Sequence, residues 1–187
     1  MRVFIAIEMT DEIKSALSQL QSRLKYAGAD VKWVEEKNIH LTLKFLGNID
    51  DNRCKEVTTV LGEVAETVTP FDISVGEVGA FPAPEHPRVV WVGMEKGSEQ
   101  SASLAHKIDD ALYVIGFEKD ERAFTAHLTL GRVRSPKNRI ALAEKIGALN
   151  TEKRVQAVQT VSSIILFQST LTTQGPAYTK LSEFHFK

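Results

Sequence analysis

The stretch His40-Leu41-Thr42-Leu43 occurs twice in the chain, and its second copy is His127-Leu128-Thr129-Leu130. The copies start at positions 40 and 127, which is too far apart for one local motif. Successive side chains of a β-strand point to opposite faces, so the histidine and threonine of each copy share one face and the leucines share the other. The leucines can then enter a core while histidine and threonine face a cleft. We therefore predict that two strands bring two His-Thr pairs to one site.

The composition is that of an ordinary globular protein without a strong charge bias. Of 187 residues, 43% are hydrophobic and 25% are charged, and 23 basic against 24 acidic residues give a net charge of −1. Proteins that bind nucleic acid strongly usually carry a basic excess. Any RNA binding must therefore use a local patch of charge. The single cysteine, Cys54, excludes an internal disulfide and favours a reducing, cytoplasmic setting.

Hydrophobic periodicity predicts strands and helices in mixed order along the whole chain. The expected strands are 3–7, 31–34, 38–46, 71–78, 88–92, 124–133, 155–167 and 178–186, and the expected helices start after Thr10, at Asp50 or Asp51, at Ser98, and at Ser135-Pro136. Several consecutive strands have short connections, which favours antiparallel pairing. We predict an α+β protein, one bilobal domain over residues 1–187, with two similar lobes sharing a cleft.

A pair of histidines suits displacement at phosphorus. One ring can act as a neutral base while the other acts as a protonated acid, because histidine titrates near neutral pH. The nucleophile enters on one side of the phosphate and the leaving oxygen departs on the other. The hydroxyls of Thr42 and Thr129 can donate to the non-bridging oxygens, where charge develops. The residues alone leave open which histidine is the acid.

Two cationic residues lie beside the motifs. Strict alternation puts Lys44 on the face of His40, so its ammonium group could add positive charge to the site. Arg132 has the opposite parity to His127, so it needs a twist or a bulge in the strand to reach the same cleft.

Other readings of these residues point to different chemistry. Zinc is a rival because histidine is a common ligand, but no cysteine or carboxylate stands within the motifs to complete a ligand set. No Gly-x-Ser-x-Gly nucleophile elbow and no phosphate-binding Gly-x-x-x-x-Gly-Lys loop is present. The remaining histidines, His86, His106 and His185, are interpreted as non-catalytic, although His86 lies in a proline-rich loop that could line a substrate path.

Aromatic residues near the motifs divide into two groups. Trp33, Phe45 and Trp91 are interpreted as core residues. Phe4 and Tyr178 are candidates for stacking on a base.

Beyond the repeated motif, further segments of the chain resemble one known family. The segments are 2–7 (Arg-Val-Phe-Ile-Ala-Ile), 40–47, 81–82 with 87–91 (Pro-Arg-Val-Val-Trp), 127–133, and 169–172 with 175–178. In order, and over essentially the whole chain, they resemble the two-histidine (2H) phosphoesterase superfamily, closest to its RNA 2′,3′-cyclic phosphodiesterases, also called 2′-5′ RNA ligases. Thr173 departs from the proline frequent in relatives, which affects a turn and no catalytic group.

The resemblance implies a pseudo-twofold fold with two antiparallel-sheet lobes, helices packed outside, and neither metal nor cofactor. It implies hydrolysis of a 2′,3′-cyclic phosphodiester at an RNA end to a 2′-phosphomonoester. Some members also join tRNA halves through a 2′-5′ bond by the same chemistry in reverse. Carried over by motif, His40 is the proton donor, His127 is the proton acceptor, and Thr42 and Thr129 bind the phosphate.

The leading hypothesis is thus a monomeric, cytoplasmic enzyme acting on RNA 2′,3′-cyclic phosphate ends, with no membrane association. Candidate substrate contacts besides the motif residues are Phe4, Lys44, Arg132 and Tyr178. One alternative is a non-catalytic module that binds RNA ends. Another is a phosphodiesterase for a small cyclic or 2′-5′-linked oligonucleotide.

Overall fold

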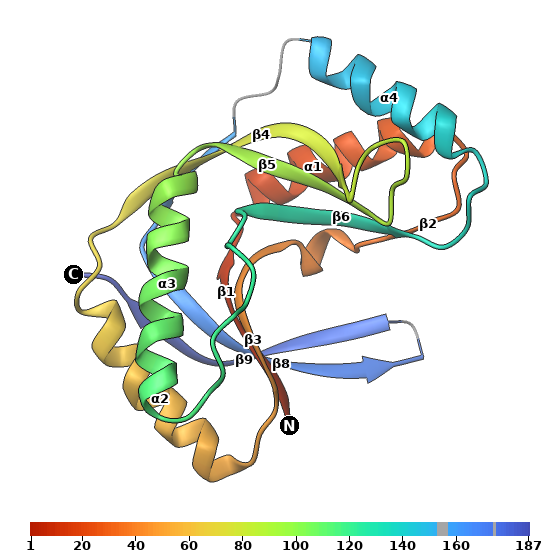
Figure 1. The fold of residues 1–187 in the computed structure, drawn as a ribbon. Helices are drawn as coiled ribbons and strands as arrows, with labels where there is room; N and C mark the ends of the chain where they lie inside the picture. Colours follow the sequence, from red (N-terminus) through yellow and green to blue (C-terminus); the bar gives the residue numbers. More distant parts are fainter. Residues whose placement is uncertain (153–156, 174) are drawn as a thin grey trace.

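Two antiparallel sheets form the framework of the chain (Figure 1). The computed structural model describes residues 1–152, 157–173 and 175–187. One sheet has the order β3-β1-β8-β9 and the other β2-β6-β5-β4-β7. The strands are β1 (Arg2–Glu8), β2 (Val31–Trp33), β3 (His40–Asn48), β4 (Phe71–Phe81), β5 (Val89–Lys96), β6 (His127–Val133), β7 (Val158–Val161), β8 (Ser163–Thr172) and β9 (Gly175–His185). The predicted α+β class with antiparallel sheets is confirmed.

Helices pack in pairs on the outside of the two sheets. They are α1 (Asp11–Lys25), α2 (Asp51–Ala65), α3 (Ser98–Val114) and α4 (Arg139–Thr151), with a 3-10 turn at Glu36–Asn38. Helices α2 and α3 lie together over the four-stranded sheet, whereas α1 and α4 lie over the five-stranded one (Figure 1). Within the described residues, none of these helices is long and apolar enough to cross a lipid bilayer.

The two sheets repeat one arrangement. In the order β3-β1-β8-β9, the first motif lies on the first strand, and in β6-β5-β4-β7 the second motif also lies on the first strand. β2 is then an extra strand added beside β6. Since β3 and β6 also contact each other, the repeat places the two motif strands side by side across the boundary between the sheets. This geometry agrees with the predicted pseudo-twofold relation.

Helix α1 shows how local sequence signals place these elements. Thr10 caps the helix by accepting a hydrogen bond from the Ile13 amide, and Asp11 and Glu12 occupy the first turn, where negative charge favours the helix dipole. On its buried face, Gln21 is only 3% exposed and donates to the main-chain carbonyls of Val34 and Leu130, each at 2.8 Å. Gln21 thus ties the helix to β6.

The start of α4 differs from the prediction. We expected Ser135-Pro136 to begin the helix, but it begins at Arg139 after Asn138, which has a φ of 54° in the left-handed region. Asn138 donates through Nδ2 to the Gly28 carbonyl at 3.0 Å. Asparagine tolerates this backbone conformation better than most residues. The hydrogen bond to Gly28 holds Asn138 in it, and the helix therefore starts at the next residue. Positions 155 and 156 of the expected strand 155–167 lie outside the described residues.

Candidate active site

Four motif side chains line one cleft where the two sheets meet. His40 and Thr42 come from β3, and His127 and Thr129 come from β6. The cleft encloses about 260 Å³. On each strand the intervening leucines are buried, as the alternation requires. The structure therefore brings together the two His-Thr pairs that the sequence singled out.

A β-bulge follows each His-Leu-Thr triplet and changes which side chains face the cleft. Opposite β1, Thr42 pairs with Ala6 and Lys44 with Ile5, so Leu43 is the extra residue. Opposite β5, Thr129 and Gly131 pair with consecutive residues in the same way, so Leu130 is extra. A bulge shifts the alternation by one residue. The second residue after each bulge, Phe45 or Arg132, therefore returns to the histidine face, and the residue directly after the bulge, Lys44 or Gly131, points to the opposite face.

The bulges bring Phe45 and Arg132 into the cleft as equivalent residues of the two lobes. Both line it, and Phe45 is 62% exposed, which corrects its interpretation as a core residue. Arg132, which strict alternation places on the face opposite His127, reaches the cleft because of the bulge at Leu130. Trp33, also assigned to the core, is half-buried and lines the cleft from β2.

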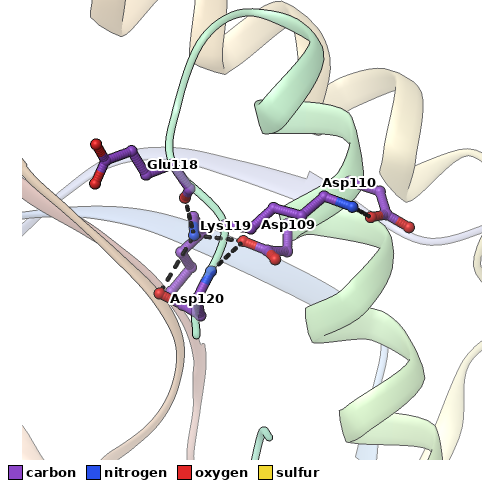
Figure 2. A network of polar contacts seen from close by, with 6 residues as sticks. Asp109, Asp110, Glu118, Lys119 and Asp120 are labelled. Carbon is purple, nitrogen blue, oxygen red and sulfur yellow. Dashed lines mark hydrogen bonds and ion pairs between the residues drawn. The ribbon is translucent and has the colours of Figure 1, made fainter. Parts of the chain in front are cut away.

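The same bulge turns Lys44 away from the cleft, against the expectation from strict alternation. Lys44 is 4% exposed. Its ammonium group contacts the carboxylates of Asp109 and Asp120 and donates to the Glu118 carbonyl at 3.0 Å. Figure 2 shows these partners converging from helix α3 and the loop that follows it. With its charge neutralised inside this network, Lys44 is a structural residue and we do not retain it as a substrate contact.

Each histidine is held by the same hydrogen bond. Nδ1 of His40 lies 2.7 Å from the Asn38 carbonyl oxygen, and Nδ1 of His127 lies 2.7 Å from that of Thr125. A carbonyl oxygen can only accept, so Nδ1 carries the proton in both rings. Nε2 is then the ring nitrogen available for proton transfer, and it can act as a base when neutral or as an acid when protonated.

Aromatic rings support both imidazoles. The ring centroid of His40 lies 4.9 Å from that of Phe4 and 5.2 Å from that of Tyr178, and His127 lies 5.1 Å from Phe81. Phe4 is 2% exposed within a small cluster below His40. This burial corrects the expectation that Phe4 stacks on a base, because its ring already packs against His40. Tyr178 is half-buried and lines the cleft.

Burial also shifts the pKa of two groups in the cleft. It lowers the pKa of His40 below the usual histidine value of 6.5; the hydrogen bond to the Asn38 carbonyl opposes this, and the nearby charge of Lys14 adds to it. Burial raises the pKa of Tyr178, against the influence of Arg132 and Arg2. The Tyr178 phenol is therefore a neutral hydrogen-bond donor at neutral pH.

Several polar groups of the cleft have no hydrogen-bond or ion-pair partner within the described part of the chain. Among the residues that the structure describes, the hydroxyls of Thr42 and Thr129 make no hydrogen bond, and Arg132 and Lys32 form no ion pair. Such groups are free to bind an anionic ligand. The arrangement combines two proton-transfer nitrogens with hydroxyl and guanidinium donors, which is what displacement at a phosphate requires.

The remaining histidines lie apart from this cleft. His86 is exposed in the proline-rich loop beside Arg139, at 3.5 Å, and His106 and His185 are exposed on α3 and β9. Within the described part of the chain, no three histidine, cysteine, aspartate or glutamate side chains are grouped as a metal site would require.

Comparison with known proteins agrees with this geometry. The family model described as "LigT like Phosphoesterase" matches the chain twice, over residues 7–91 and 92–178, and each match contains one motif copy. A protein of Methanothermobacter thermautotrophicus named RNA 2′,3′-cyclic phosphodiesterase is 38% identical over 183 residues, which cover 98% of this chain and 97% of that protein.

Solved structures show the same fold. The crystal structure of TT0787 of Thermus thermophilus matches with a TM-score of 0.81 at 24% identity and covers 100% of this chain and 98% of its own. That of E. coli LigT complexed with 3′-AMP matches with a TM-score of 0.77 at 22% identity and covers 99% and 97%. With the twofold family match and the full-length relative, the chain belongs to the LigT-like phosphoesterases, the two-histidine family that its repeated motif resembles.

Proposed function

We propose that this protein hydrolyses RNA 2′,3′-cyclic phosphate ends to 2′-phosphomonoesters. The observation that carries the proposal is the pair of identically anchored imidazoles in one cleft with two unpartnered threonine hydroxyls. The relative from Methanothermobacter thermautotrophicus, named for this activity, supports the choice of substrate. The roles of acid and base follow the family resemblance, because the two anchors are alike.

In this mechanism each motif residue has one task. Nε2 of His127 accepts a proton from water as the water oxygen forms a bond to phosphorus. The bond between phosphorus and O3′ breaks, and Nε2 of His40 donates a proton to the departing oxygen. Thr42 and Thr129 donate to the non-bridging oxygens, and Arg132 offsets their negative charge. A 5′-hydroxyl in place of water would form a 2′-5′ bond by the same steps, as in the joining of tRNA halves.

The direction of ring opening tests the substrate's orientation in the cleft. We expect O3′ to face His40, so the product carries a 2′-phosphate and a free 3′-hydroxyl. Tyr178, whose ring contacts His40, and Phe45, which lines the same cleft, are our candidates for holding the terminal nucleoside. Phosphorus NMR of the product from a cyclic-ended RNA distinguishes the two isomers. A dominant 3′-phosphate would reject this orientation and leave the acid–base pair intact, whereas binding without any turnover would favour the RNA-end binding module.

The rate should depend on pH with a bell-shaped profile. One ring must be neutral and the other protonated, so kcat/KM falls on both sides of an optimum. The acidic limb of kcat/KM reports the pH at which the doubly protonated pair loses its first proton. Because burial lowers the pKa of His40, we expect this limb below pH 6.5, the usual pKa of histidine. Both limbs describe the coupled pair.

A bound phosphodiester anion should move this profile. Negative charge beside His40 favours its protonated form. The acidic limb of kcat, which reports the complex, should therefore lie at higher pH than that of kcat/KM. A rate that climbs steadily into the alkaline range would show that only a base is needed.

Activity should not depend on a metal ion. The motifs offer two histidines and no carboxylate or thiolate, and acid–base transfer with hydroxyl and guanidinium donors accounts for each step. We expect full turnover after prolonged treatment with a chelator and removal of the chelate. Rescue of an inactive, metal-free preparation by zinc or manganese would contradict this mechanism.

A further inference from the structure

The cleft continues past the catalytic residues into a second arm. This extension shares Thr42, Phe45, His127, Thr129 and Arg132 with the catalytic cleft. His127 lines it and His40 does not, so it opens on the side of the proposed base. Its further lining includes Phe81, Pro82, Arg88, Val89, Arg122 and Phe124, and the Lys44–Asp120 ion pair also borders it. We refer to the part lined by Arg88, Arg122 and Phe124 as the arginine arm.

The arginine arm has an excess of positive charge. Arg88 and Arg122 are exposed and, within the described ranges, neither forms an ion pair, as is also true of Arg132. Asp120 also lines this arm and pairs with Lys44 at 3.4 Å, and because Lys44 also pairs with Asp109, these three groups leave one net negative charge against the three arginines. In a chain of net charge −1, three guanidinium groups that have no ion-pair partner among the described residues therefore face one cleft. Guanidinium groups match phosphate oxygens in shape and in hydrogen-bonding geometry.

The backbone segments that carry Arg88 and Arg122 are held by contacts to neighbouring elements. The Arg88 amide donates to the Phe81 carbonyl at 2.7 Å, and its carbonyl accepts from the Val133 amide at 2.9 Å, which joins it to β6. Arg122 lies on the loop between α3 and β6, where Lys44 binds Asp120 and the Glu118 carbonyl (Figure 2). These contacts hold the backbone from which the two arginine side chains extend beside the catalytic cleft.

We propose that the arginine arm binds the phosphodiester backbone of RNA next to the reacting phosphate, on the side where the nucleophile enters. This inference rests on the proposed function and adds a second subsite to it. The bound backbone can belong to the strand that carries the cyclic end, or to a second strand whose 5′-hydroxyl attacks in place of water. In either case an oligonucleotide gains contacts that a cyclic mononucleotide lacks.

The test compares two substrates. Steady-state constants are measured for 2′,3′-cyclic AMP and for a short RNA that ends in the same cyclic nucleotide. The variants are Arg88→Gln, Arg122→Gln and their combination, and Arg134→Gln is the control because Arg134 is also exposed and unpaired in the described structure and lines neither part of the cleft. We expect kcat/KM for the RNA to fall about tenfold per arginine, since a hydrogen bond to a charged group contributes about 1.5 kcal/mol or more.

The loss should be specific to the polymer. The effect on cyclic AMP should be at least several-fold smaller, and the dependence of log KM on log salt for the RNA should weaken by about one unit per arginine. An equal loss for both substrates, no loss for the RNA, or the same loss in Arg134→Gln would overturn the proposal.

Binding without turnover separates this inference from the proposed function. A fluorescent RNA with 5′- and 3′-hydroxyl ends has no cyclic phosphate, so its anisotropy reports the arm even if the enzyme is inactive. Weaker binding by the double variant indicates that the arm holds an incoming strand, and loss of 2′-5′ joining would accompany it. Unchanged anisotropy together with a loss on the cyclic-ended RNA assigns the arm to that strand. If neither measurement changes, the arginine arm does not bind RNA.

Discussion

Replacing His40 or His127 with alanine is expected to lower the turnover of a cyclic-ended RNA by about a hundred- to ten-thousand-fold, the usual contribution of general acid–base catalysis. Each variant loses one Nε2, and no other side chain described in the cleft is both titratable near neutral pH and anchored in this way. The double variant should be little worse than the weaker single one, because residues that act as a pair are not additive.

The control for these variants is His106→Ala, which removes an exposed histidine from α3, away from the cleft. It should keep wild-type activity. Circular dichroism and thermal melting should show all variants folded, since both catalytic rings lie at the edge of the core. Thr42→Ala and Thr129→Ala should lose less activity, because each removes one hydrogen-bond donor and leaves both proton-transfer groups. Near-normal turnover in a folded His40→Ala or His127→Ala protein would reject the two-histidine mechanism.

The alternation of each motif was enough to predict much of this site. Leu41 and Leu128 are fully buried while their neighbouring histidines line the cleft, as period-two patterning requires. The sequence repeat also predicted two similar lobes, because equal segments tend to form equal structures. These inferences depended only on residues within each strand.

The bulges could not be predicted from the same pattern. The sequence pattern continues to alternate through Leu43 and Lys44. Whether a bulge occurs there depends on the register with β1, a partner strand far away in the sequence. The bulge in β6 depends equally on tertiary contacts, since the Leu130 carbonyl accepts from Gln21 of α1 and from the Val34 amide. Alternation therefore predicted Lys44 in the cleft and Phe45 in the core, whereas Lys44 is buried and Phe45 lines the cleft. The local pattern of residues also does not predict which sheet a strand joins. β2 precedes the first motif in the chain but joins the sheet of the second motif.

The residue directly after each bulge differs in size and charge between the two lobes: it is Lys44 in the first and Gly131 in the second. In the second lobe Gly131 packs against β2, and a Cβ there would lie 2.6 Å from Val31 Cγ1. In the first lobe Lys44 occupies the equivalent place on β3, which is an edge strand among the described strands, and α3 and the loop after it supply its partners instead. A small residue suits close strand packing, whereas a long cationic one spans the gap to an acidic loop.

This difference makes Lys44 the residue whose loss should destabilise the fold most among the charged side chains. The side chains of Lys44 and Asp109 are 3% and 13% exposed, and removing one partner of a buried pair leaves the other charge unpaired. Such losses cost about 3–5 kcal/mol. For a chain of this size the melting temperature of Lys44→Met should therefore fall by about 10 °C.

Lys119→Met is the matched control for Lys44→Met. Lys119 pairs with Asp110 between the same loop and the same helix (Figure 2), but both side chains are more than half exposed. Solvent screens such a pair, so its loss should leave the melting temperature nearly unchanged. Adding Asp109→Leu to Lys44→Met should restore part of the stability, because it removes the unpaired carboxylate, and the double-mutant cycle then gives the coupling directly. Equal melting temperatures for Lys44→Met and Lys119→Met would show that the buried network does not fasten the loop to β3.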